Sequence, residues 1–392
     1  MGAGQWPVRR GAIVCTALLA VLLVAGCGQA GITVPATDPL QLSSWQLMRS
    51  DGQQLQLADG VVPYMLNAPL FTDYAHKLRT VSLPAGQAAT VNADGSLDFP
   101  VGTVISKTFF YPRAATGVAR LADTGADLLP ALGEHGGLDL TSVQLVETRL
   151  LVHRPQGWVG LPYVWNAEQT EALLEVTGDI KSLTLVHGAD ATPFAPLPFA
   201  YVVPDQNQCG GCHGTNTASK QINPIGPHVA NLNRTVGVAY GSSGNTAENQ
   251  LQLWQQQGLL ILDTPVADYP AMVAWQDSQQ PLAGRARSYL HSNCGHCHSS
   301  TGPADTSGLY LDQLTTNPVR LGECKLPIAA GQGTGGHQYS IVPGEPAESI
   351  LIYRMQTRDP GAMMPELGRS LVHTEGVDLV SEWIAQLPGG CA

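Results

Sequence analysis

The sequence predicts a multidomain fold in which an N-terminal all-β domain, a sandwich or a small barrel, precedes mainly α units. The chain has 392 residues, and at roughly 100–200 residues per domain this length suggests two or three domains. Residues 39–205 contain alternating or β-branched apolar segments separated by Gly, Pro, Asn and Asp, a pattern typical of strands. Helical patterns come later, at residues 246–257, 281–292 and 374–387.

The charge balance is acidic, with 20 Lys and Arg residues against 31 Asp and Glu residues and a formal net charge of -11. Few cations are available to neutralise a phosphate backbone, so this balance argues against a nucleic-acid partner. It favours protein partners with basic docking surfaces, whose association would weaken as the salt concentration rises.

The N-terminus has the pattern of an export signal. Arg9 and Arg10 precede an apolar run at residues 12–24, and small residues lead up to Cys27. The run is shorter than the ~20 apolar residues that span a bilayer, so a transmembrane anchor is the weaker alternative. The letters V-A-G-C that end at Cys27 resemble the lipobox of bacterial lipoproteins, which implies cleavage before this residue, lipidation of its thiol and anchoring by several acyl chains. Because Gly28 follows instead of Asp, the resemblance implies the outer membrane, facing the periplasm or the cell surface.

Four of the eight cysteines form two pairs that are each followed at once by histidine, C-G-G-C-H at 209–213 and C-G-H-C-H at 294–298. C-x-x-C-H is the attachment pattern of haem c, in which the two thiols bind the haem vinyl groups and the histidine is the proximal iron ligand. One such motif arises by chance with odds of about 0.005 at this composition. Two covalently attached haem c groups are therefore predicted, and their binding residues are Cys209, Cys212, His213, Cys294, Cys297 and His298.

Three rival interpretations of the cysteine pairs remain. A four-cysteine zinc site would need the two pairs to converge. A thioredoxin-type redox pair would need a βαβ context. Two structural disulfides are disfavoured by the tight spacing. The two cysteines left after these pairs and the N-terminal ones, Cys324 and Cys391, are expected to form a disulfide in an oxidising compartment, with two free thiols as the alternative.

Met364 is the expected distal ligand of the second haem, with Met363 as the neighbour that could take its place. A helix before C-x-x-C-H, a methionine in a Pro-flanked loop and a closing helix together resemble a class I cytochrome c domain at residues 281–392. His/Met ligation closes the iron to small ligands and suits electron transfer.

The distal ligand of the first haem is left open by the sequence. Met272 is the only methionine between the two motifs, and His228 and His291 are the other candidates. Met272 lacks the Met-Pro pattern, and a core role for it is equally expected. An open sixth position at this haem is the further alternative.

The whole mature chain resembles a family of dihaem c-type cytochromes that are exported proteobacterial lipoproteins. This resemblance implies an exported electron-transfer protein and brings no substrate with it. The segments that carry it are 62–79, 99–109, 147–151, 157–166, 224–227, 249–254, 285–290 and the loop at Met364-Pro365.

A weaker likeness connects the N-terminal half with the cytochrome P460 β fold, through the F-P-x-G-T segment that begins at Phe99 and precedes a C-x-x-C-H motif. On that reading the first haem iron could be five-coordinate. Lys107 would then be of interest, because catalytic members of that family link a lysine to the haem. The plainer expectation is a strand lysine that faces solvent.

Three further features of the sequence bear on function. Asp73, near His76 and Lys77, is a candidate for a catalytic or metal role, but a structural role is the stronger expectation. Glu147 and Arg149 are expected to form a partly buried ion pair. His296, inside the second motif, is expected to face solvent.

These observations divide the chain into a signal peptide (1–26), a lipidated tether (27–38), a β-rich domain (39–205), a first haem-c unit (206–280) and a cytochrome c-like domain with the second haem (281–392). The preferred hypothesis is an electron carrier between redox partner proteins, not a stand-alone enzyme. One alternative is a haem enzyme with an open site at the first haem. Another is a β domain that recognises a surface partner or glycan.

Overall fold

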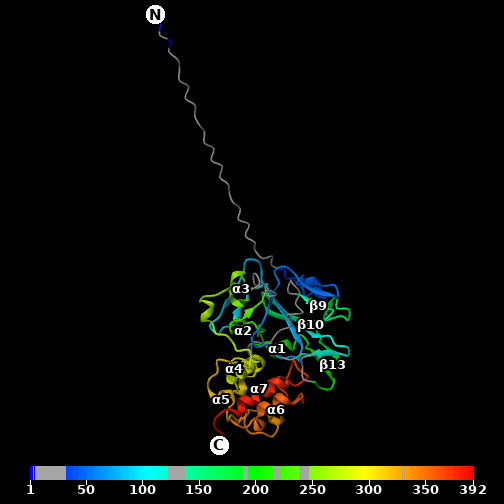
Figure 1. Ribbon diagram of the computed structural model, residues 1–392, viewed down its shortest axis with the longest axis vertical. Helices are drawn as coiled ribbons and strands as arrows, with labels where there is room; N and C mark the ends of the chain where they lie inside the picture. Colours follow the sequence, from blue (N-terminus) through cyan, green and yellow to red (C-terminus); the bar gives the residue numbers. More distant parts are fainter. Residues whose placement is uncertain are drawn as a thin grey trace.

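The computed structural model describes residues 1–2, 4, 32–121, 137–188, 193–214, 221–237, 247–328 and 330–392. Strands β10 and β13 lie in one half of the folded body with α1, α2 and α3, and α4 to α7 gather in the other half with the C-terminus (Figure 1). The apolar run of the expected export signal and Cys27 lie outside the described residues. None of the helices described is long and apolar enough to cross a membrane.

An antiparallel six-stranded sheet forms the centre of the β-rich half, with strand order β12-β11-β10-β7-β4-β3. Its long strands are rich in Val, Leu, Phe, Tyr and Thr, the residue types that suit a pleated, buried surface. A bulge between Leu145 and Glu147 changes the register between β10 and β7. The strands are β3 (Val62–Tyr64), β4 (His76–Ser82), β7 (Val104–Pro112), β10 (Val143–Arg154), β11 (Gly157–Trp165) and β12 (Ala172–Leu174).

Four smaller sheets surround the central one, in the orders β1-β2-β9, β14-β13-β8, β17-β5-β6 and β15-β16. Their strands are β1 (Met48–Ser50), β2 (Gln54–Leu57), β5 (Ala89–Val91), β6 (Leu97–Asp98), β8 (Val118–Arg120), β9 (Leu138–Asp139), β13 (Asp179–His187), β14 (Leu197–Val203), β15 (Thr235–Val236), β16 (Glu248–Asn249) and β17 (Leu260–Ile261).

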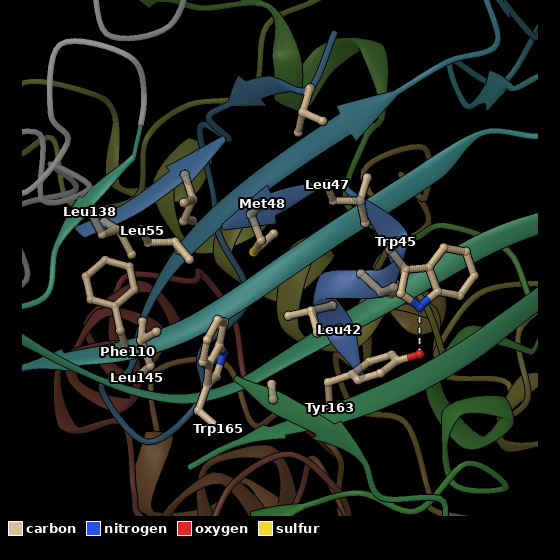
Figure 2. Packing of buried hydrophobic residues seen from close by; sticks show 14 of the residues in the cluster. Leu42, Trp45, Leu47, Met48, Leu55, Phe110, Leu138, Leu145, Tyr163 and Trp165 are labelled. Atoms are coloured by element: carbon tan, nitrogen blue, oxygen red, sulfur yellow. Dashed lines mark hydrogen bonds between the residues drawn. The ribbon is translucent and has the colours of Figure 1, made fainter. Parts of the chain in front are cut away.

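The central sheet is buried on both faces. Residues of one face pack with the segment that contains the 3-10 helix η1 (Leu42–Trp45) and strand β1, and the Trp45 indole donates a hydrogen bond of 2.7 Å to the Tyr163 hydroxyl (Figure 2). The other face contributes Ile105 to one cluster and Phe109 to another. This second face also carries Lys107 and Arg149, the cationic side chains near the first cysteine pair.

The helices are short, and the longest of those described, α7, has 12 residues. The α-helices are α1 (Cys209–His213), α2 (Val229–Leu232), α3 (Gln250–Gln256), α4 (Leu282–Leu290), α5 (Pro318–Leu321), α6 (Ile350–Gln356) and α7 (Thr374–Ala385). The other helical turns are η4 (Val266–Asp268), η5 (His291–Gly295), η6 (Asp305–Ser307), η7 (Gly331–Thr334) and η8 (Pro346–Glu348).

The expected fold class, an all-β domain followed by mainly α cytochrome c-like units, is wrong. The described residues form 17 strands and only seven short α-helices, and 21% of these residues are helical. The expected first haem unit is not a separate helical body, because its strand β17 pairs in parallel with β5 of the β-rich half. The 43 Gly and 28 Pro residues of the chain disfavour long helices, which explains why turns and 3-10 segments replace them.

Candidate haem-attachment centre

The first cysteine pair lies on α1, which packs against the central sheet. The place of the Cys209 side chain depends on Gly160 of β11, because a Cβ atom at that glycine would come within 2.9 Å of the Cys209 Sγ. Both thiols of the pair are free. The helix thus presents Cys209, Cys212 and His213 within a single turn, as the spacing of the motif requires.

His213 is held in a single tautomer by the backbone. Its Nδ1 lies 2.8 Å from the carbonyl oxygen of Asn223, and a carbonyl can only accept, so Nδ1 carries the proton. Burial lowers the pKa of His213 to about 3, with the positive charge of Lys107 as the next cause. The ring is therefore neutral at pH 7, and Nε2 keeps its lone pair with no hydrogen-bond partner in the described parts of the chain. A hydrogen bond of this kind fixes the ring orientation of a metal-binding histidine.

His298 of the second pair has a similar contact at Nδ1, and its ring also makes a hydrogen bond with the Leu309 backbone. Its Nδ1 lies 3.3 Å from the Oγ of Ser307, which donates its own proton to the Ala304 carbonyl at 2.7 Å and so can accept from the imidazole. Burial lowers the pKa of His298, which favours the neutral ring. The peptide nitrogen of His298 donates to the Cys294 carbonyl at 2.8 Å, so the motif continues the helical turn that follows α4.

A small pocket with a cavity volume of about 20 Å³, partly open to solvent, lies beside the second pair. Cys294 and Met364 both line it, whereas Met363 does not. This is the arrangement in which one side chain could hold a haem edge and the other could approach its iron. The remaining lining residues are Phe71, Tyr289, Asn293, Met355, Pro365, Leu367, Gly368, Arg369, His373 and Val377.

The Met364 loop is fixed from inside the second unit by Arg369. The Arg369 guanidinium donates to the carbonyl oxygen of Met364 at 3.1 Å and to that of Leu371 at 3.2 Å. Its Nη2 also donates to the carbonyls of Arg354 and Thr357, each at 3.0 Å. These four contacts tie both ends of the loop to α6 and to the residue after it.

The β-rich half completes the pocket. The buried Asp73 carboxylate accepts hydrogen bonds from the peptide nitrogens of Ser370, at 2.8 and 2.9 Å, and Leu371, at 2.7 Å. Phe71 lines the pocket and stacks on His373 with the ring centroids 4.2 Å apart. Asp73 therefore has the structural role that the sequence favours. Its contact with the Met364 loop, like that of Phe71, does not follow from the sequence, because the partners lie about 300 residues further along the chain.

The two cysteine pairs are in contact. The Sγ of Cys297 lies 3.7 Å from the carbonyl oxygen of Gly211, inside the first motif. A Cβ atom at Gly211 would lie 3.2 Å from the Cδ1 of Leu367, so the Met364 loop reaches the first motif as well. The sequence, in which the motifs are 85 residues apart, does not reveal this juxtaposition.

The structure bears on the two remaining cysteines and on the zinc-site alternative. Cys324 and Cys391 form a disulfide with an S–S distance of 2.14 Å, and all four cysteines of the two motifs are free. Within the described residues, no group of three or more His, Cys, Asp or Glu side chains is arranged to hold a metal ion. The two pairs thus approach each other, as a four-cysteine zinc site would require, but the described side chains are not arranged as such a site.

Met272 and His228 have structural surroundings. Met272 is 4% exposed and packs in the core cluster that contains Trp275. His228 caps α2 by accepting from the Ala230 peptide nitrogen at 3.2 Å, and its Nε2 lies 2.8 Å from the Asp94 carbonyl oxygen. Both nitrogens of His228 are thus engaged. The third candidate, His291, accepts at Nδ1 from the peptide nitrogen of Gln313 at 3.3 Å.

Two sequence expectations about exposure are wrong. His296 does not face solvent, because its Nδ1 is buried and burial lowers its pKa to about 4. Lys107 is half-buried on the face of the central sheet that carries Phe109, and burial together with Arg149 and Arg79 lowers its pKa to about 7.

The expected ion pair of Glu147 and Arg149 is present, with an N–O distance of 2.6 Å.

Comparisons of the chain with family models, with curated proteins and with solved structures find no match. The chemistry of this centre is therefore argued from its own residues.

Proposed function

We propose that the chain is an exported dihaem c-type cytochrome that passes electrons between redox partner proteins at the periplasmic or outer-membrane face. One observation carries the proposal. Each C-x-x-C-H motif combines two free thiols with a half-buried histidine whose Nδ1 is bonded to an oxygen acceptor and whose ring is kept neutral by its surroundings. This is the donor set that attaches haem c and holds its iron.

The residues divide between the two haems as follows. Cys209 and Cys212 would hold the first haem, with His213 as its proximal ligand. Cys294 and Cys297 would hold the second, with His298 proximal. Met364 fits the distal position of the second haem because it lines the same pocket as Cys294. When bound, each haem supplies a one-electron iron couple.

The protein's own contribution is to hold these ligands rigidly and to limit solvent access. Arg369 and Asp73 fix the Met364 loop, and Phe71 covers one wall of its pocket. A rigid, largely apolar pocket favours small reorganisation on electron transfer and excludes competing ligands. The contact between the two motifs supports transfer from one haem to the other within the chain.

The surroundings of the protein follow from the same chemistry. The Cys324–Cys391 disulfide fits an oxidising compartment, where haem c attachment also occurs. We propose that Cys27 carries a lipid anchor to the outer membrane. With a net charge of -11, the chain would select redox partners with basic docking surfaces.

The pyridine haemochrome spectrum of the purified mature protein tests the proposal. The expected result is two haem c groups per chain, with one lost in a Cys209→Ser/Cys212→Ser variant and the other in a Cys294→Ser/Cys297→Ser variant. Mass spectrometry of the intact chain checks the covalent attachment. A wild-type protein that is exported by a host competent in haem c assembly and contains no haem contradicts the proposal.

A second candidate function is a haem enzyme with an open coordination site at the first haem. The observation in its favour is that both ring nitrogens of His228 are already hydrogen-bonded and that Met272 packs in the core. Carbon monoxide added to the reduced protein decides between the two functions. Binding of one equivalent favours the enzyme, and two haems that do not respond favour the electron carrier.

A further inference from the structure

Three cationic side chains lie side by side across the centre of the six-stranded sheet. Arg79 of β4 and Arg149 of β10 are each directly opposite Lys107 of β7. Residues directly opposite one another on neighbouring strands point to the same face of a sheet. We call these three residues the cation row.

The cation row contains a lysine, Lys107, that no carboxylate of the described residues pairs with. Glu147 is the carboxylate next to it on β10, and it is already engaged by Arg149 at 2.6 and 2.8 Å and by the Tyr201 hydroxyl at 2.7 Å. Lys107 makes no hydrogen bond or ion pair with any described residue, and its ammonium lies 5.3 Å from the centroid of the Phe109 ring. A half-buried cation between two other cations is costly unless an anion joins it.

The cation row lies beside the first haem-attachment motif. Cys209 packs on Gly160 of β11, the strand next to β10. Lys107 is within electrostatic range of Cys212 and His213, and Arg149 is within range of Cys209 and Cys212. An anion on the row would therefore sit next to the first motif, on the inner face of the sheet.

We propose that the cation row is an anion-binding site, in which Lys107 and its two arginine neighbours bind a compact, negatively charged oxygen group. Ammonium and guanidinium groups bind carboxylates and inorganic oxyanions with the same charge-assisted hydrogen bonds. The group has two sources. It is the propionate of an attached haem, in which case the site rests on the proposed function, or it is a free oxyanion that binds beside the haem.

Whether substitution of Lys107 lowers or raises the Tm tests the anion-binding site. Lys107→Met removes the ammonium and keeps a long, unbranched side chain in the full-length, haem-loaded protein. If an anion occupies the site, the variant has a lower Tm than the wild type because the anion loses its partner. If the site is empty, the Tm rises because an unpaired, half-buried charge is removed, and this result overturns the proposal. Lys181→Met is the matched control, since the Lys181 side chain is 36% exposed and pairs with Asp179 at 2.7 Å.

Two further measurements distinguish the sources of the anion. A free oxyanion predicts that inorganic phosphate raises the Tm of the wild type and of Lys181→Met with a saturable dependence, and that this effect is lost in Lys107→Met. A haem propionate predicts no phosphate effect and a shift of the propionate bending band in the resonance Raman spectrum of Lys107→Met. A lower Tm with neither signature assigns Lys107 to packing and overturns the site.

The haem content of each sample keeps this test separate from that of the proposed function. A chain without haem contradicts the proposed function, yet its Tm still reports phosphate binding at the row. A chain that contains two haems but binds no anion at the cation row supports the proposed function and contradicts the anion-binding site.

Discussion

At the scale of single residues, the histidines that end the two C-x-x-C-H motifs each have a hydrogen bond at Nδ1 that sets the tautomer. The Asn223 carbonyl and the Ser307 hydroxyl fix the tautomers of His213 and His298, and burial keeps both rings neutral. Met364 differs from Met363 in that it lines the pocket beside Cys294. These distinctions lead to two predictions.

Replacement of Met364 by Ala is expected to change one haem only. Loss of a thioether ligand removes the weak long-wavelength absorption band of His/Met haem and lowers the reduction potential of that haem, because methionine ligation raises it. A spectroelectrochemical titration measures both. Met363→Ala is the matched control and should leave the spectrum unchanged, and an equal effect of the two variants would remove Met364 from the ligand set.

Asp73 is expected to make stability depend on pH. Burial raises its pKa from 3.8 to about 6, opposed in part by the hydrogen bonds from Leu371 and Ser370. The folded state therefore favours the protonated carboxyl. Its contribution is fully present below about pH 4 and is lost as the pH rises through about 6. Between pH 4 and pH 7 the free energy of unfolding should fall by about 3 kcal/mol more in the wild type than in Asp73→Asn. Urea denaturation at several pH values checks this, and parallel curves would contradict it.

At the scale of elements, β10 carries a buried polar network on a strand that is otherwise apolar. Glu147 is completely buried, and it connects Arg149 of the same strand with Tyr201 of β14. The bulge before Glu147 adjusts the register so that this residue lies opposite Phe109 and shares a face with Arg149. The network thus joins the central sheet to the sheet of β13 and β14.

Glu147→Gln is expected to destabilise the protein by about 3 kcal/mol, because it leaves the half-buried Arg149 guanidinium without its charge partner. Chemical denaturation followed by circular dichroism measures the loss. Asp179→Asn breaks the exposed pair with Lys181 and should cost less than about 1 kcal/mol. Similar losses for the two variants would show that the buried network does not differ from a surface pair.

At the scale of the whole molecule, the two halves are joined by contacts and not by a simple linker. Asp73 and Tyr74 of the β-rich half bind the backbone and side chains at residues 370–375, and Arg120 pairs with Glu375. The Cys324–Cys391 disulfide ties the chain after the second motif to the C-terminus, across a sequence separation of 67 residues. The second unit is thus stabilised by a disulfide within it and by polar contacts with the β-rich half.

Removal of the disulfide by Cys324→Ser/Cys391→Ser is expected to lower the free energy of unfolding by about 2–4 kcal/mol, because the unfolded chain regains the freedom of a long loop. The haem content and the spectrum of the second haem should stay unchanged in the folded variant, since neither cysteine lines the Met364 pocket. Differential scanning calorimetry of the haem-loaded protein measures the loss. An unchanged Tm would contradict the prediction.

The sequence by itself determined what is local. The two C-x-x-C-H motifs, the histidines beside them and the Met364-Pro365 loop are contiguous patterns, because attachment of a group at two thiols needs a fixed short spacing. The strands at residues 104–112 and 143–154 and the helix at 374–385 also follow from local periodicity. The proportion of helix was predicted wrongly, because short pairings such as β17 with β5 depend on residues that are about 170 positions apart.

Only the tertiary structure decided which distant residues support the site. Asp73 and Phe71 reach the Met364 loop, Cys297 meets Gly211, and Lys107 comes to lie between two arginines, all through contacts between segments far apart in the chain. Periodicity assigns a residue to a face of its own strand or helix, but it does not say what that face will contact. Burial and charge pairing, which set the pKa values and the anion site proposed above, arise only from those contacts.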